Sequence, residues 1–332
     1  MKRLAYIPAF LLLLLVACMP GGDKERGGQW QPGAPNGEAL RVVAIDTMDL
    51  ANPFVVYDNV SDTYYMAGDG GCLWRSNDLR MWEGPYSVLL PSKGAWMGES
   101  PVITSPEIHR YAGRFCYVAT FTSIADGVEY TSCEVFVSDS INGPYKHATE
   151  GLPLVAGERV AKTPTFRAED YGAAYLLFSG DAKRTAGEAI KIIRLGDSLN
   201  VQIGEPFELL KAAHNPWATG REGEPLALGS PFVFATQTGR LGMLFTAKTG
   251  GNNVLGVAYS KEGHGINGPW TIEPAPLLCG VGGAMLFKDY DGTAVLAVHK
   301  DTTLCGKEKH VPQFIKADLQ YEKLKLKGHY KF

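Results

Sequence analysis

The sequence lacks the features of several large classes of protein. Its 332 residues contain no amphipathic helical pattern of the length that alternating strand–helix folds require. The formal net charge is only −3 and no stripe of basic residues occurs, which argues against nucleic acid as a partner. The cysteines that follow Cys18 are widely spaced, so they do not predict a metal site. We therefore expect neither a doubly wound fold nor a nucleic-acid-binding protein, and we expect no cofactor.

A long membrane-spanning run is also missing, although the chain begins with an apolar segment. Lys2 and Arg3 precede this segment, which is too short to cross a bilayer as a mature helix and is typical of an export signal. It ends in Leu15-Val16-Ala17-Cys18, which resembles a bacterial lipobox. Residues 1–17 are therefore predicted to be a lipoprotein signal peptide, with lipid attached to Cys18.

The residues after Cys18 are rich in glycine, proline and polar side chains, and such a composition cannot bury enough apolar surface to fold. Residues 18–41 are therefore predicted to be a flexible tether. We expect a lipid-anchored protein of the cell envelope, on the periplasmic face or the cell surface, with the membrane as a partner through its anchor.

From residue 42 onwards, one pair of strands recurs five times. In each copy an apolar strand, a turn at Asp or Gly and a second apolar strand follow one another, and proline opens four of the five copies. The turns are at Asp62, Gly113, Gly172, Gly239 and Gly292. A strand repeat of about fifty to seventy residues is typical of β-propeller blades. We predict an all-β domain, a monomeric five-bladed β-propeller over residues 42–332.

A second motif repeats toward the end of three of these units. A glycine and a proline precede an aromatic residue in Gly84-Pro85-Tyr86, Gly143-Pro144-Tyr145 and Gly268-Pro269-Trp270. Glycine and proline favour a turn, and the aromatic residue can cover the gap to the next blade. The motif supports the assignment of repeated blades.

Several blade motifs together resemble those of family 43 glycoside hydrolases. They are Asn52-Pro53-Phe54-Val55-Val56, Ser76-Asn77-Asp78-Leu79 with Trp82, Ser105-Pro106-Glu107-Ile108-His109, and Gly239-Arg240-Leu241 with Met243-Leu244. The resemblance covers roughly residues 42–325. It implies a propeller that acts, with inversion, on polysaccharides or oligosaccharides containing arabinose, xylose or galactose.

The resemblance also implies three catalytic carboxyl groups on the axis, and the chain departs from that pattern at each of them. Asn52 stands where the general base is expected, and an amide cannot take a proton from water. Lys162 is aligned with the Asp that tunes the acid, and Gly229 with the general acid. Blade five has Gly282-Gly283-Ala284 where the family often has a histidine close to a bound cation. We therefore expect impaired catalysis and no metal.

Other carboxylates could have taken over the chemistry. Glu107 lies in a matched motif, where it could contact sugar or hydrogen-bond neighbouring strands, and His109 alternates with it on the same face. Glu222 and Glu224 precede the blade-four strand and could reach the axis or remain solvated loop charges.

Sugar sites also need flat aromatic surfaces, which Trp96 and Trp217 could provide from loops before blades two and four. The predicted substrate-binding residues are Asn52, Trp96, Glu107, His109, Lys162 and Trp217. Three functions remain open: a glycan-binding protein with impaired catalysis, an active inverting glycosidase with relocated carboxylates, and a protein-interaction propeller.

Overall fold

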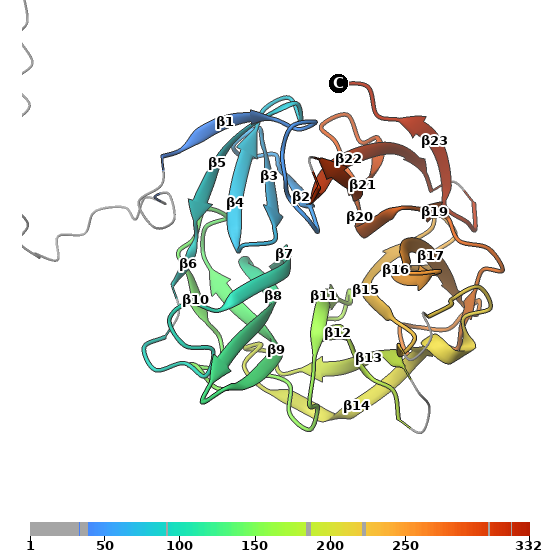
Figure 1. Ribbon diagram of the computed structural model, residues 1–332, viewed down its shortest axis with the longest axis horizontal. Coiled ribbons are helices and arrows are strands. Elements are labelled where there is room, and N and C mark those ends of the chain that lie inside the picture. Colours follow the sequence, from blue (N-terminus) through green and yellow to red (C-terminus); the bar gives the residue numbers. More distant parts are fainter. Residues whose placement is uncertain are drawn as a thin grey trace, which may run out of the picture. The chain divides into compact units, whose positions relative to one another are not determined.

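Five β-sheets surround a central axis in the computed structural model, which confirms the predicted five-bladed propeller (Figure 1). The structure describes residues 33, 39–90, 92–183, 187–220, 224–304, 306–319 and 321–332. The chain divides into two units, Met1–Trp30 and Gln31–Phe332, and the described residues belong to the second. The predicted signal peptide, Cys18 and Glu222 lie outside the described residues, and the predicted boundaries of the leader and tether stay predictions.

The first two blades each have five strands. From its outer edge to the axis, blade one contains β1 (Arg41–Ala44), β5 (Met81–Ser87), β4 (Cys72–Ser76), β3 (Thr63–Gly68) and β2 (Phe54–Asp58). Blade two contains β6 (Leu89–Leu90), β10 (Tyr145–His147), β9 (Val128–Ser138), β8 (Arg114–Ala125) and β7 (Val102–Tyr111). All neighbouring strands are antiparallel except β6 and β10, which are parallel.

The other three blades follow the same plan. Blade three contains β14 (Gln202–Lys211), β13 (Glu188–Leu195), β12 (Ala174–Asp181) and β11 (Lys162–Ala168). Blade four contains β18 (Trp270–Ile272) and β19 (Leu278–Cys279), which both pair with β17 (Asn252–Ser260), then β16 (Leu241–Thr249) and β15 (Leu228–Ala235). Blade five contains β23 (Lys325–His329), β22 (Lys307–Asp318), β21 (Ala294–Leu304) and β20 (Val281–Lys288). A short 3-10 helix, η2 (Ala212–His214), precedes blade four.

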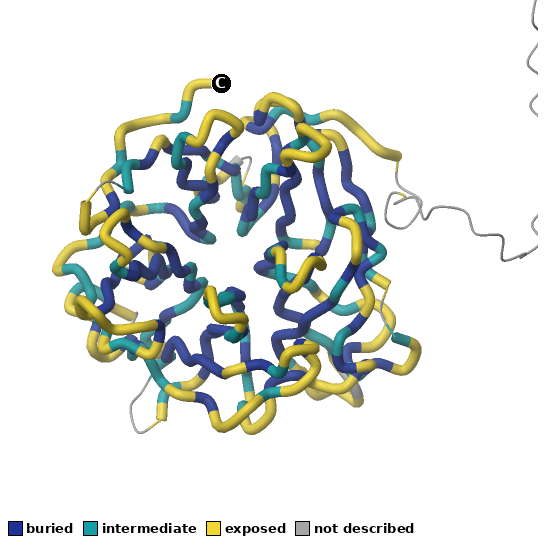
Figure 2. The backbone as a smooth tube through the Cα atoms, turned by 180° about the vertical axis from the view of Figure 1, so that it is seen from behind, coloured by how far each residue is buried: buried dark blue, intermediate teal, exposed yellow. Residues whose placement is uncertain are grey.

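The middle strands of the blades are buried on both faces, because each blade packs against two neighbours. In β12, for example, Leu176, Leu177 and Phe178 are consecutive and all fully buried. Such continuous apolar runs distinguish these strands from half-buried strands, which alternate apolar and polar residues. Exposed residues are concentrated in the loops and turns around the blades (Figure 2). Among the described residues, no helix is long and apolar enough to cross a membrane.

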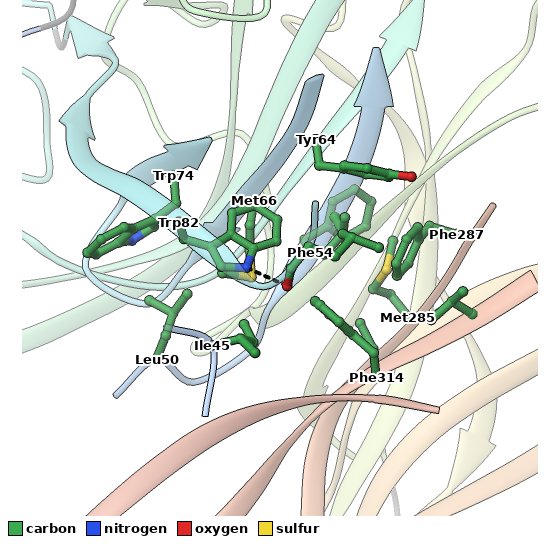
Figure 3. Close-up of a cluster of buried hydrophobic side chains, with 14 of the residues drawn as sticks. Ile45, Leu50, Phe54, Tyr64, Met66, Trp74, Trp82, Met285, Phe287 and Phe314 are labelled. Carbon is green, nitrogen blue, oxygen red and sulfur yellow. Dashed lines mark hydrogen bonds between the residues drawn. The ribbon is translucent and has the colours of Figure 1, made fainter. Parts of the chain in front are cut away.

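Among the described residues, the two ends of the ring of blades are joined without a shared strand. The first strand, β1, pairs with β5 inside blade one, and the last strand, β23, pairs with β22 inside blade five. Phe54 and Trp82 of blade one instead belong to one buried cluster with Met285, Phe287 and Phe314 of blade five (Figure 3). Apolar packing therefore joins the first blade to the last.

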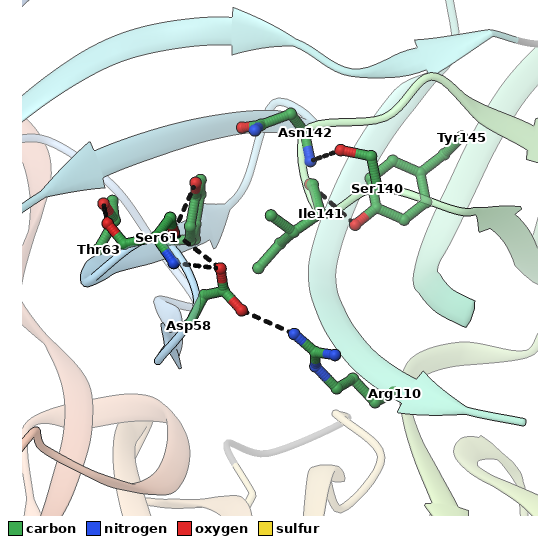
Figure 4. Close-up of polar contacts among 9 residues, drawn as sticks. Asp58, Ser61, Thr63, Arg110, Ser140, Ile141, Asn142 and Tyr145 are labelled. Carbon is green, nitrogen blue, oxygen red and sulfur yellow. Dashed lines mark hydrogen bonds and ion pairs between the residues drawn. The ribbon is translucent and has the colours of Figure 1, made fainter. Parts of the chain in front are cut away.

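Polar contacts also join neighbouring blades. Asp58, the last residue of β2, is 7% exposed. Its Oδ1 accepts a hydrogen bond from Arg110 Nη2 of blade two at 2.7 Å (Figure 4). Its Oδ2 accepts from the backbone and the hydroxyl of Ser61. The Gly-Pro bonds of the repeated turn motif, at Pro85, Pro144 and Pro269, are all cis.

Candidate functional site

The inner strand of every blade begins with the same unusual backbone conformation. Asn52, Ser105, Thr163, Ser230 and Gly283 have φ angles of 51°, 50°, 50°, 47° and 57°. Such left-handed angles are uncommon for most residues and easiest for glycine and asparagine. In blades two to five the strand register shifts at this place, which marks a β-bulge. We call these five residues the axial ring.

An axial pocket lies inside this ring. Its volume is about 30 Å³, enough for a few water molecules, so a sugar ring would lie at its mouth rather than within it. It is lined by Asn52, Pro53, Phe54, Ser105, Pro106, Glu107, Pro164, Ser230, Pro231, Gly283, Ala284 and Met285. Further along the same strands lies a second cavity of about 400 Å³, and its lining residues include His109, Arg110 and Arg167.

Glu107 is the carboxylate that lines the axial pocket, and it is also held by its neighbours. The residue is 8% exposed, and its Oε2 accepts hydrogen bonds from Thr165 Oγ1 at 2.9 Å and from the backbone N–H of Phe166 at 3.2 Å. His109 Nε2 lies 2.6 Å from the same oxygen, and its ring packs between Phe54 and Phe166. Glu107 thus joins blade two to blade three, as one of its two sequence interpretations predicted.

Asn52 is held from two sides. Its backbone N–H donates to His299 Nδ1 of blade five at 3.0 Å, and its Nδ2 donates to Asp69 Oδ1 at 2.8 Å. A side chain at Gly283 would collide with Asn52 Oδ1, so glycine is required there for this packing. The Asn52 amide therefore has a defined orientation at the pocket, with Nδ2 toward Asp69 and Oδ1 toward Gly283.

Sequence reasoning missed Asp69, which directly follows β3. Its Oδ1 also accepts the backbone N–H of Ser105 at 2.8 Å, so one oxygen connects ring residues of blades one and two. Burial raises the pKa of Asp69, and the hydrogen bonds from Asn52 and Ser105 partly offset that rise. The sequence feature that could have identified Asp69 is an acidic residue between two glycines directly after a strand, in Gly68-Asp69-Gly70.

A second missed group is the cluster of His299, Asp301 and His310. Asp301 Oδ1 lies 3.5 Å from His299 Nε2 and 3.0 Å from His310 Nδ1, and Asn253 Nδ2 donates to Asp301 Oδ2. His299 is the register partner of Gly282 on the adjacent strand, and its ring fills the space beside Gly282 and Gly283. An imidazole from the adjacent strand therefore lies where the sequence indicated the loss of a histidine.

The three side chains could supply ligands to a metal ion, because their donor atoms lie within 4.8 Å of one another. The protonation of His299 does not fit that role. Since Nδ1 accepts the Asn52 N–H, a neutral ring carries its proton on Nε2, the nitrogen that faces Asp301. Burial lowers the pKa of His299 to about 4, which keeps the ring neutral. The cluster is built as a chain of hydrogen-bonding groups that supports Asn52.

Comparison with known proteins now identifies the family. The model of glycosyl hydrolases family 43 matches residues 44–311. This chain belongs to family 43. The chain is 25% identical to an endo-arabinase from Bacteroides thetaiotaomicron, with a TM-score of 0.73 over 86% of this chain and 100% of that one. No curated protein matches the sequence.

Two more distant structures share the fold. An endo-1,4-beta-xylanase from Bacteroides thetaiotaomicron is 18% identical, with a TM-score of 0.68 over 87% of this chain and 97% of that one. An alpha-L-arabinanase from Cellvibrio cellulosa, complexed with arabinohexaose, is 14% identical, with a TM-score of 0.61 over 84% of this chain and 96% of that one. The family 43 propeller is thus preserved at low identity.

The axial ring refines the alignment of this family 43 chain in blade three. Thr163, rather than Lys162, has the backbone conformation of Asn52 and precedes the proline. Lys162 lies one position earlier, and its Nζ contacts Glu188 Oε1 at 2.5 Å. The sequence alignment was therefore offset by one residue, because the bulge displaces Lys162 from the ring. Neither residue is a carboxylate, so the departure from the implied family pattern remains.

The two predicted sugar-stacking tryptophans do not line the axial pocket. Trp96 is half-buried against blade two and donates its indole N–H to Glu134 Oε1 at 2.8 Å. Trp217 donates to the backbone oxygen of Glu273 and stacks on Phe245 with an interplanar angle of 8°. Both have packing roles, and their contact with a glycan stays a prediction.

Of the two candidate acids before blade four, Glu224 alone is among the described residues. Glu224 is exposed and does not line the axial pocket, while Glu222 lies outside the described residues. Glu224 in this structure matches the interpretation of a solvated loop charge.

Proposed function

We propose that this family 43 protein binds arabinose- or xylose-containing polysaccharide at its axial pocket and is impaired in hydrolysis. The observation that carries the proposal is the composition of the axial ring, which consists of one asparagine, two serines, one threonine and one glycine and contains no carboxylate. The similar structures include an endo-arabinase and a xylanase, which supports the substrate class.

The chemistry of an inverting glycosidase explains why these positions matter. One carboxylate must take a proton from the attacking water while a second carboxyl group protonates the leaving oxygen. Asn52 cannot accept that proton, and loss of a general base typically costs about 10²–10⁴-fold in rate. Glu107 lines the pocket, but one of its oxygens is already occupied by donors from two blades. Binding therefore fits the pocket better than efficient cleavage.

The predicted lipid anchor gives the binding function a location. Lipid on Cys18 and a flexible segment over residues 18–41 would hold the propeller near polysaccharide at the cell envelope. Fractionation of the full chain and a Cys18→Ala variant tests this part of the proposal. We expect the unmodified chain in the membrane fraction and the variant in the soluble fraction.

The central experiment measures binding and turnover on the same material. A domain that starts near residue 40 is titrated with arabinan, arabinoxylan, xylan and galactan, and release of reducing ends is followed in parallel. The proposal predicts saturable binding to an arabinose- or xylose-containing polymer without appreciable release. Turnover at rates ordinary for glycosidases would establish an active enzyme with relocated carboxylates, and Asp69, beside Asn52, would be exchanged first. Absence of both signals would favour a protein partner.

A further inference from the structure

We propose that Asp69 is the positioning residue of the axial pocket, and that its carboxylate makes an amide, rather than an acid, the workable side chain at position 52. The inference rests on the proposed function only in taking the axial pocket as the glycan site. The presence of an amide at position 52, in place of the acid of the family pattern, then depends on Asp69 in the same blade.

The contacts of Asp69 are the first argument. Its Oδ1 accepts two N–H groups at 2.8 Å, one from the Asn52 side chain and one from the Ser105 backbone. Both donors belong to ring residues with left-handed backbones, one in each of two blades. Since N–H groups need an oxygen acceptor, Asp69 fixes the relative positions of two residues that line the pocket.

The orientation of Asn52 is the second argument. The two ends of an amide are nearly alike in shape, so only its partners decide which end faces the pocket. Here Asp69 takes Nδ2 and His299 takes the backbone N–H, which leaves Oδ1 beside Gly283. The pocket therefore presents a neutral acceptor at this place, which suits the hydroxyl of an uncharged sugar.

The third argument is what a carboxylate at position 52 would meet. One of its oxygens would replace Nδ2 and face Asp69 Oδ1 at hydrogen-bond distance. Two carboxyl groups this close cannot both be ionised, and they share one proton. His310 lowers the pKa of Asp69 electrostatically, while Asp69 in turn raises the pKa of the buried Tyr117 phenol. An acid placed at position 52 alone would therefore be part of a proton-sharing pair, not a free base.

The test is a double-mutant cycle on the propeller domain with three variants: Asn52→Asp, Asp69→Asn and the exchange that combines them. The exchange again pairs one amide with one carboxylate. Melting temperatures are measured from pH 5 to 8. We expect Asn52→Asp to lower the melting temperature by about 4 °C at pH 8. The deficit should shrink toward pH 5, because a shared proton is bound more tightly in the folded state than in the unfolded chain.

The exchange variant should recover most of the loss at pH 8. A matched control combines Asn52→Asp with Asp49→Asn. Asp49 accepts the backbone N–H of His310 and not the side chain of Asn52, so this combination should not recover stability. The inference is overturned if the effects of Asn52→Asp and Asp69→Asn simply add at every pH, or if the Asp49 control recovers as much as the exchange.

Binding to arabinan, measured on the unmodified domain in parallel, separates this inference from the proposed function. Coupled melting without binding would support the positioning role of Asp69 and reject the glycan site. Binding with additive melting would support the glycan site and reject the positioning role.

Discussion

Two junctions of the propeller bring a histidine and a carboxyl group to the axial ring, and they do so in different ways. Between blades two and three, Glu107 is itself a pocket residue, and one of its oxygens accepts from Thr165 and Phe166 and contacts His109. Between blades five and one, the pocket residue is the neutral Asn52, and His299 and Asp69 lie behind it. The comparison shows that a carboxylate near a propeller axis can be a structural acceptor. Whether its oxygens are free to accept further hydrogen bonds therefore matters more than its presence.

The junction with Glu107 is the more sensitive to substitution. Glu107→Leu removes the acceptor of two buried donors, and each unpaired donor costs about 1–3 kcal/mol. We expect the free energy of unfolding to fall by about 3 kcal/mol or more, measured by urea denaturation. Glu224→Leu, which removes an exposed carboxylate, is the control and should have little effect. A loss of glycan binding with unchanged stability would contradict the structural role of Glu107.

The contribution of the His299 junction to the stability of the protein should depend on pH. The pKa of this buried imidazole is lowered from about 6.5 to about 4, so the unfolded chain binds the proton more readily between those values. Stability is therefore lost as pH falls through this range, by about 2 kcal/mol at pH 4.5 for His299 alone. His299→Gln should show a smaller decrease between pH 7 and 4.5 than the unmodified protein. Parallel pH profiles for the two proteins would contradict the assignment.

Trp96 provides a test away from the ring. Trp96→Phe keeps an aromatic ring but removes the N–H that Glu134 accepts, and Glu134 is fully buried. We expect a loss of about 1–2 kcal/mol in the free energy of unfolding and an unchanged affinity for glycan. A marked fall in affinity would instead support the sequence prediction that Trp96 contacts the sugar.

Lys162 should show the smallest effect. Its side chain is 40% exposed, and partly exposed ion pairs such as that with Glu188 contribute about 1 kcal/mol or less. Lys162→Met should therefore unfold almost like the unmodified protein. Glycan titration of the same variant tests the predicted sugar contact, since a large change in affinity at constant stability would show that Lys162 reaches the ligand.

The sequence was sufficient for the fold, because each blade repeats the same local signals. Proline before an apolar strand, a glycine turn and the Gly-Pro motif are all short-range patterns. The site was less accessible, because its contacts join distant segments. His299 reaches Asn52 across 247 positions, and Asp69 reaches Ser105 across 36. Thr163 precedes the repeated proline just as Asn52 does, so the one-residue offset of Lys162 could have been corrected from the sequence.

The left-handed backbone of the axial ring has a consequence for protein engineering. Positions 52, 105, 230 and 283 line one small pocket in this conformation, and position 283 has room only for glycine. Few residue types accept such backbone angles readily, chiefly glycine, asparagine and aspartate. A combinatorial library at positions 52, 105 and 230 could therefore change the chemistry of the pocket while the blades stay unchanged.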